Sequence, residues 1–163
     1  MIEVAENLVA LLAAEGLVCA TAESCTGGSI AAAITDVPGS SAVFAGGVVS
    51  YANEVKRDVL GVEQAALDAY GAVSPQTAAQ MAQGALSLLK CDIAVSVTGI
   101  AGPGGGSDEK PVGLVWFGIA DRSGVRTEKA LFPGDRQEVR RRAAVHALGM
   151  LTVAAAGGKA VAK

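Results

Sequence analysis

Residues 17–28, LVCATAESCTGG, contain the transition that indicates the fold class of this chain. The run Leu17–Ala22 is short and apolar and includes Val and Cys, which predicts a buried β-strand. The SCTGG turn follows it, and residues 28–35 then carry apolar side chains at helical spacing. A buried strand that leads through a glycine-bearing turn into a helix is typical of an α/β domain.

The rest of the chain continues this alternation of helices and short apolar strands. Apolar periodicity and turn residues predict helices over residues 2–15, 53–60, 63–70 and 74–90, and a last helix that begins at Asp135. Strands are predicted over residues 43–51, 92–98, 112–120 and 124–132, the last two as a hairpin. We therefore expect a single domain over residues 1–163, with an α/β fold: a three-layer α/β/α sandwich around a mixed, mostly parallel sheet.

For two helices the sequence also predicts the residue that caps the N-terminus. Asn53 can cap its helix with its side chain. Asp135 is the expected N-cap of the last helix, and Glu138 the expected partner in a capping box, in which each side chain binds the backbone N–H of the other residue. On the same helix, Arg136 and Arg140 share the apolar side.

Composition removes several classes of function. A net charge of −3 and a pI of about 5.1 do not match a nucleic-acid binder. No apolar stretch is long enough to span a bilayer, and the N-terminus lacks the basic region of a signal peptide. The three cysteines have no CxxC spacing, so reduced thiols and a cytoplasmic location are expected. His146 is the only histidine, and we expect a packed structural residue there and no metal or other cofactor.

The first candidate site is the turn of AESCTGG. Ser24, Cys25 and Thr26 place three nucleophilic side chains side by side, before Gly27 and Gly28. The turn lies where a strand meets a helix, and free backbone N–H groups there attract an oxyanion or a phosphate. The alternative is a capped turn in which a hydroxyl only closes the helix.

The second candidate is the glycine-dense segment TGIAGPGGG at residues 98–106. Small residues such as Gly99 and Gly102, after Thr98, would let the backbone approach a nucleotide closely. The alternative is a surface loop without a ligand.

The third candidate is Lys56, in SYANEVK. A lysine that serves as a base must be neutral, so its pKa must fall well below the ordinary value of about 10.4. Burial and nearby positive charge both lower the pKa of a lysine, and Arg136 and Arg140 could supply that charge or clamp a phosphate. The alternatives are a solvated lysine and arginines at the rim of the site.

Four segments, in the same order, resemble the C-terminal domain of the CinA family: AESCTGG, VVSYANEVKRDVLGV, GAVSP and VSVTGIAGPGGGSDEKPVGLVWFGIA. The likeness runs from about Val4 to Leu151. Domains of this family that occur alone are nicotinamide-nucleotide amidases. The resemblance therefore implies hydrolysis of nicotinamide mononucleotide to nicotinate mononucleotide and ammonia, a step of pyridine nucleotide salvage.

The resemblance also implies residue roles. Ser24 is the implied nucleophile, Lys56 the base and Tyr51 a hydrogen-bonding helper. From the motifs and the resemblance together, the expected contacts to a small-molecule nucleotide substrate are Thr26, Gly27, Gly28, Thr98, Gly99, Gly102, Arg136 and Arg140. Chemistry then predicts an acyl-enzyme on Ser24, with backbone N–H groups of residues 25–28 holding the oxyanion.

Alternatives remain open from the sequence. Cys25 competes with Ser24 for the role of nucleophile, although no histidine partner other than His146 exists for it. The chain could also be a non-catalytic nucleotide-binding module that regulates a partner, or an amidase for another small substrate. A homo-oligomer is expected, because the alanine-rich helix face of residues 78–86 could pack against a second subunit or against the sheet.

Overall fold

One five-stranded sheet forms the centre of the computed structural model, which describes residues 1–157. Its strands are β1 (Cys19–Glu23), β2 (Phe44–Val49), β3 (Ile93–Gly99), β4 (Leu114–Asp121) and β5 (Gly124–Leu131), in the spatial order β2-β1-β3-β4-β5. β1 pairs in parallel with β2 and β3, whereas the β3–β4 and β4–β5 pairs are antiparallel. β4 thus runs against the other four strands, and the expected mixed, mostly parallel sheet is confirmed.

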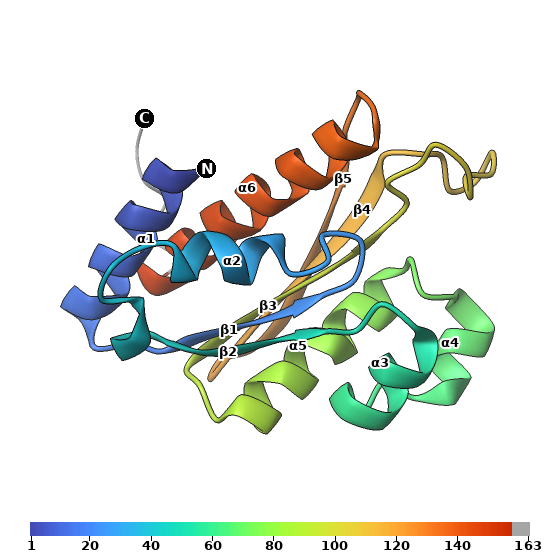
Figure 1. Cartoon of the computed structure of the whole chain (residues 1–163). Coiled ribbons are helices and arrows are strands. Elements are labelled where there is room, and N and C mark those ends of the chain that lie inside the picture. The colour runs from blue at the N-terminus through green and yellow to red at the C-terminus, as the bar shows by residue number, and fades with distance from the viewer. Residues whose placement is uncertain (158–163) are drawn as a thin grey trace.

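Helices cover both faces of the sheet (Figure 1), which confirms the three-layer architecture. One face carries α1 (Ile2–Glu15), α2 (Ser29–Thr35) and α6 (Arg136–Ala155); the other carries α3 (Asn53–Leu60), α4 (Gln64–Tyr70) and α5 (Pro75–Leu89). A 3-10 turn, η1 (Ser40–Ala42), precedes β2. Within residues 1–157, no helix is both long and apolar enough to cross a bilayer. Residues 158–163 of the expected domain lie outside the described residues.

Alternation along the strands divides the core between the two layers. In β3, Val95 and Val97 pack with α1, α2 and α6, while Ala94, directly before Val95, packs toward α5. The alanine-rich face of α5 is also used internally, since its buried residues contact the sheet. Small residues allow this close approach: a Cβ at Gly118 of β4 would lie 2.5 Å from the carbonyl oxygen of Ala78 on α5. The face that could have served an oligomer therefore packs on the sheet.

Helix ends follow the expected signals with two exceptions, the first of which concerns Asn53. Ser74 caps α5 by accepting a hydrogen bond from the Thr77 N–H at 3.2 Å, and Gly61 ends α3 in a left-handed conformation. Asn53 does not cap α3, because it is already the first helical residue and Ala52 stands at the N-cap without a side-chain hydrogen bond. The expected Asn53 cap is wrong by one position.

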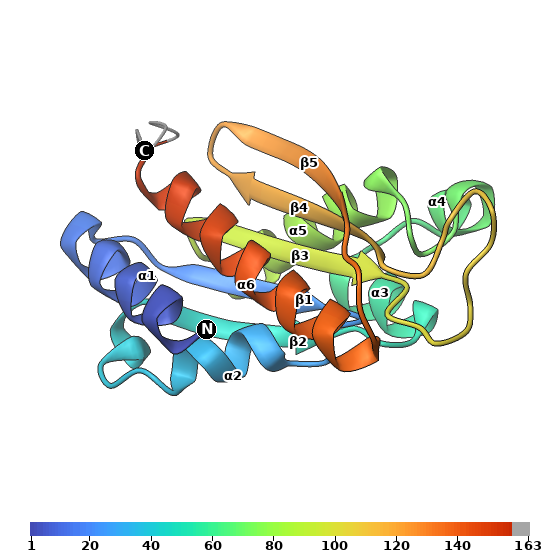
Figure 2. The ribbon, with the colours of Figure 1, turned by 90° about the horizontal axis from the view of Figure 1, so that it is seen from above.

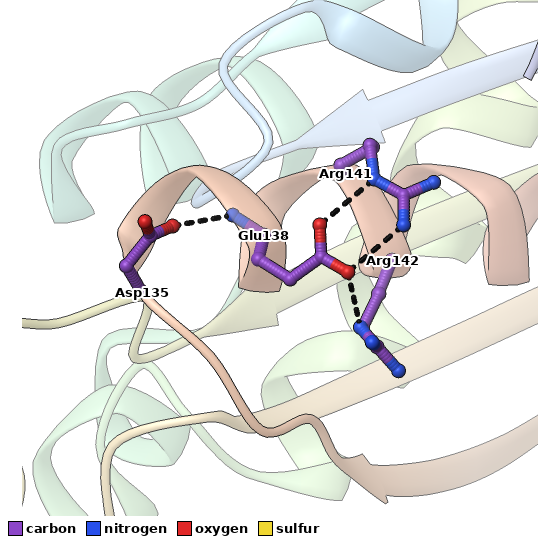
Figure 3. Close-up of polar contacts among 4 residues, drawn as sticks. All are labelled: Asp135, Glu138, Arg141 and Arg142. Atoms are coloured by element: carbon purple, nitrogen blue, oxygen red, sulfur yellow. Dashed lines mark hydrogen bonds and ion pairs between the residues drawn. The ribbon is translucent and has the colours of Figure 1, made fainter.

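The second exception is the capping box of α6, of which only half forms (Figure 3). The Asp135 carboxylate accepts from the Glu138 N–H at 2.9 Å, as expected. The Glu138 carboxylate binds Arg141 and Arg142 instead of the backbone N–H of Asp135. Hydrogen bonds from these two guanidinium groups stabilise the carboxylate and lower the pKa of Glu138 to about 2.

Candidate active site

The carboxyl ends of the three parallel strands bring the candidate residues to one edge of the sheet (Figure 2). Glu23, the last residue of β1, is level with Val49 of β2 and with Val97 of β3. The next residues stay in contact: the Ser24 N–H donates to the Val97 carbonyl at 2.9 Å, and the Ser50 N–H donates to the Glu23 carbonyl at 2.8 Å. Ser24 therefore lies beside the segment that leads into α3 and Lys56.

Lys56 and Ser24 form a hydrogen-bonded pair. The Lys56 Nζ lies 3.1 Å from the Ser24 Oγ, 2.7 Å from the Ser50 carbonyl oxygen and 3.3 Å from the Tyr51 carbonyl oxygen. The lysine side chain crosses the interior and is only 1 % exposed. The solvated alternative is therefore wrong. In the neutral amine, the two N–H groups can serve the two carbonyls, which leaves the lone pair for the hydroxyl of Ser24.

Burial favours the neutral form of this lysine. Because the charged form loses its hydration in the interior, the pKa of Lys56 is lowered from its ordinary value, with a smaller opposing effect from Cys25. Arg136 and Arg140 are not among the causes. The sequence-based expectation named burial and positive charge together, and burial is the one that acts.

Cys25 is a poor candidate for the nucleophile. Its side chain is 6 % exposed and belongs to the apolar cluster beneath α6. Burial raises the pKa of the Cys25 thiol to about 11, so the thiol stays protonated near neutral pH. His146 gives it no help: that ring packs on Phe117 and lies 2.9 Å from the Glu128 carboxylate, on β5.

Glu23 is a further residue of the site, and sequence reasoning missed it. Its carboxylate is 1 % exposed and accepts three backbone hydrogen bonds at the start of α2: from Gly28 at 3.0 Å, Ile30 at 3.1 Å and Ala31 at 2.9 Å. A carboxylate here also suits the positive end of the helix dipole. The available signal was an acidic residue at the end of an otherwise apolar strand, directly before a turn and a helix.

Hydrogen bonds within the turn leave fewer backbone N–H groups for the expected oxyanion site. The Gly28 N–H is used by Glu23, and the Gly27 N–H donates to the Ser24 carbonyl at 3.1 Å. Among the described residues, the N–H groups of Cys25 and Thr26 have no protein acceptor. The expected stretch of four donors is therefore reduced to two. The Thr26 hydroxyl is also buried without a hydrogen-bond partner in the described part of the chain.

Glu23→Gln is expected to destabilise the fold. The amide offers one accepting oxygen, and its NH₂ group would face at least one backbone N–H, so the free energy of unfolding should fall by about 2 kcal/mol. Urea denaturation followed by circular dichroism measures this change. The matched control is Glu6→Gln on the exposed side of α1, which should change stability little. Equal effects at both positions would contradict the capping role.

Arg140 holds the turn of residues 24–28 from the side of α6. Its Nε donates to the Cys25 carbonyl and its Nη2 to the Thr26 carbonyl, both at 3.0 Å. A longer contact of 3.5 Å reaches the Ser29 hydroxyl. The guanidinium was expected to contact substrate, but in this structure its hydrogen bonds go to the turn.

Arg136 connects two segments at the mouth of the site. Its Nη1 donates to the Gly102 carbonyl at 2.8 Å, and its Nη2 donates to the Tyr51 hydroxyl at 3.1 Å. Tyr51 is 61 % exposed, and its hydroxyl lies with Arg136 whereas its backbone carbonyl contacts Lys56. The structure thus brings Tyr51, Gly102 and Arg136 together, at the surface beside the Ser24–Lys56 pair.

Thr98 and Gly99 contribute to the framework of the site. The Thr98 hydroxyl is 1 % exposed and donates to the Ala72 carbonyl at 2.8 Å. A Cβ at Gly99 would lie 2.7 Å from the Leu114 carbonyl oxygen, so strand packing requires glycine there. Neither residue presents a free polar side chain to a ligand in this structure.

A metal site requires a group of ligating side chains, and a site for a larger ligand requires a cavity. Within the described residues, no three His, Cys, Asp or Glu side chains lie together as a metal-ligand group. A cavity of about 610 Å³ lies beside β4 and β5, lined by residues that include Tyr70, Trp116 and Leu131. It contains neither Ser24 nor Lys56.

Both the sequence and the structure match a known family. The model of the CinA C-terminal domain matches residues 1–154, so the chain belongs to the CinA C-terminal domain family. The solved structure of the competence/damage inducible protein CihA from Agrobacterium tumefaciens is similar, with a TM-score of 0.91 and 48 % identity over 95 % of this chain and 94 % of that one.

Relatives of two lengths are similar in sequence. A putative competence-damage inducible protein from Caldanaerobacter subterraneus is 52 % identical over 91 % of this chain, which covers 36 % of that protein. The nicotinamide-nucleotide amidohydrolase PncC of Enterobacter agglomerans is 54 % identical over 90 % of both chains. The chain thus spans about a third of the longer relative and nearly all of the shorter one.

Proposed function

We propose that this protein hydrolyses the carboxamide of nicotinamide mononucleotide to nicotinate mononucleotide and ammonia through an acyl-enzyme on Ser24. The observation that carries this proposal is the 3.1 Å contact between the buried Lys56 Nζ and the Ser24 Oγ. The 54 % identity to a nicotinamide-nucleotide amidohydrolase over nine-tenths of both chains supports an amidohydrolase. The substrate and the dyad are inferences from the site and from that relative's name.

In the first step, neutral Lys56 accepts the hydroxyl proton of Ser24 as the Oγ attacks the carboxamide carbon. The oxyanion that forms accepts from the free N–H groups of Cys25 and Thr26, each worth roughly 3 kcal/mol in the transition state. Collapse of this intermediate breaks the C–N bond, and protonated Lys56 returns its proton to the departing ammonia. The product of this half-reaction is a nicotinoyl ester on Ser24.

In the second step, water attacks the ester carbon and gives its proton to Lys56. Collapse then releases nicotinate mononucleotide, and the Ser24 oxygen recovers its proton from Lys56. Lys56 is one partner in every proton transfer of the cycle. The cycle therefore requires Lys56 to return to the neutral form after every turnover.

The nucleotide phosphate is assigned to Arg136. This side chain is exposed at the start of α6 and touches both Tyr51 and the Gly102 loop, where a substrate enters. An arginine binds a phosphate with two parallel hydrogen bonds. Arg140 keeps its hydrogen bonds to the turn of residues 24–28, and Thr26, Gly27 and Gly28 form the floor of the site.

Ammonia release from a panel of pyridine amides tests this function. Purified protein is expected to release ammonia from nicotinamide mononucleotide in step with the formation of nicotinate mononucleotide, whereas Lys56→Ala protein releases none above background. Ammonia from another amide only would support an amidase of different specificity. Nucleotide binding without any ammonia would support the regulatory module and contradict the proposal.

A further inference from the structure

The free edge of the sheet at β5 is the most unusual surface of this fold outside the active site. Among residues 1–157, β5 pairs with β4 alone, and Figure 2 shows it at the margin of the sheet. Its four central residues, 126–129, are all exposed. A long exposed edge strand offers unpaired N–H and C=O groups to other strands, and natural proteins commonly cover such an edge.

The hairpin geometry shows which backbone groups face outward. The β4–β5 loop has two residues, and Asp121 pairs with Gly124 at its end. In such a hairpin the closing pair exchanges both hydrogen bonds, and hydrogen-bonded pairs then alternate with pairs that are not. Gly124 and every second residue after it therefore bond to β4. The backbone groups of Val125, Thr127 and Lys129 point to the free edge.

Charge then favours one of the three central registers, with the two-fold axis at residue 126, 127 or 128, for a second copy of the same strand. In an antiparallel pair with its two-fold axis at Thr127, the outward groups of Thr127 meet their own copies and form a hydrogen-bonded pair. Arg126 of one subunit then stands opposite Glu128 of the other, twice in each dimer. An axis at Arg126 or at Glu128 would instead place two identical charges opposite each other, which is unfavourable.

We propose that β5 pairs antiparallel with β5 of a second copy about this axis, so that the two sheets join in a symmetric dimer. Hollows on both sides of β5 also favour the binding of a second subunit. The cavity of about 610 Å³ borders β5 on the α5 side, and a hollow of about 360 Å³, lined in part by His146 and Met150, borders it on the α6 side. Leu131 is 62 % exposed at the end of the strand. A second subunit can cover these apolar surfaces.

Arg126 and Glu128 can leave their present partners and pair across the dimer interface. Arg126 bonds to Asp121 at 3.1 Å and Glu128 to His146 at 2.9 Å, and both contacts are at the surface, where such pairs stabilise little. The active-site residues follow β1 and β2, and β2 forms the opposite margin of the sheet. The dimer therefore leaves the Ser24–Lys56 pair open, and the proposal does not depend on the proposed function.

Charge reversal tests the register. By sedimentation equilibrium, the unaltered protein is expected to be a dimer. Arg126→Glu and Glu128→Arg should each weaken dimerisation about tenfold or more, because each places two like-charge pairs in the dimer. The double variant Arg126→Glu/Glu128→Arg restores opposite charges and should return the dimer constant to nearly its original value. Glu6→Arg on α1 is the matched control and should not change it.

A backbone variant tests the strand pairing independently of charge. Thr127→Pro removes an N–H that faces away from β4, so the hairpin is expected to keep its fold, as monitored by circular dichroism, while the dimer is lost. Three results would overturn the proposal: an unaltered protein that is monomeric, a folded Thr127→Pro protein that still dimerises normally, or single and double charge variants that behave alike.

Discussion

Ser24→Ala is expected to lower kcat for ammonia release by about 10⁴-fold or more, because no other side chain at the turn can form the acyl intermediate. KM should change little, since the hydroxyl contributes to the reacting centre and not to the expected phosphate contact at Arg136. Steady-state kinetics with nicotinamide mononucleotide measures both constants. Isothermal titration with the same nucleotide shows whether the variant still binds.

The matched control for this prediction is Cys25→Ala, one residue along the same turn. The buried Cys25 thiol has its pKa raised to about 11 and packs in the core, so its loss should affect stability more than turnover. If Cys25→Ala abolished activity while Ser24→Ala kept it, the thiol would be the nucleophile. If both variants stayed active, the chemistry would have to lie elsewhere in the molecule.

Lys56→Arg is expected to lower kcat by a similar factor, although the substitution keeps a long nitrogen-bearing side chain. An arginine remains protonated at any pH that the fold tolerates and cannot accept the Ser24 proton. Lys56→Met fills the same buried channel without a charge and should be equally inactive. A fold preserved in Lys56→Met, by circular dichroism, separates the loss of the base from a loss of structure.

Retained activity in either variant would contradict the assignment of Lys56. Arg57→Met is the matched control. Its side chain is exposed on α3 and bonds to Asp58 and Gln64 at the surface, so we expect nearly unaltered turnover. A charge effect of α3 as a whole would instead reduce activity in both the Lys56 and the Arg57 variants.

The order of the elements was predictable because the local signals were strong. The apolar run before SCTGG, the Ser74-Pro75 start and the glycines that end helices each specify a backbone conformation within a few residues. These signals located every strand of the sheet and the start of every α-helix to within about two residues. Asn53 shows the limit of such signals. It was the expected N-cap of α3, but the N-cap is the residue before it, Ala52.

The convergence of Ser24 with Lys56 was predictable in part. Parallel strands place their carboxyl ends at one edge, so the turn after β1 and the segment after β2 had to meet. The burial of Lys56 was not predictable from residue spacing, since it depends on how α3 packs. The resemblance to the CinA family implied only that Lys56 is the base.

Side-chain partners over long sequence distances were beyond prediction. Arg140 was expected at the substrate, but its bonds to the carbonyls of Cys25 and Thr26 join positions more than 100 residues apart. The Thr98 hydroxyl was likewise used by Ala72, on a neighbouring segment. Helical periodicity correctly placed Arg140 on the inward side, but it could not show which acceptor the guanidinium meets there.

The measurement that tests the central claim most directly is the NMR titration of the Lys56 side chain, with Lys56→Met protein to assign the signal. Because burial disfavours the ammonium, the pKa of Lys56 should lie below its ordinary value. Since only the neutral amine can act as a base, kcat/KM should fall tenfold for each pH unit below that same midpoint. A Lys56 that titrates at its ordinary value, or an acid limb at a different pH from the titration, would contradict the account.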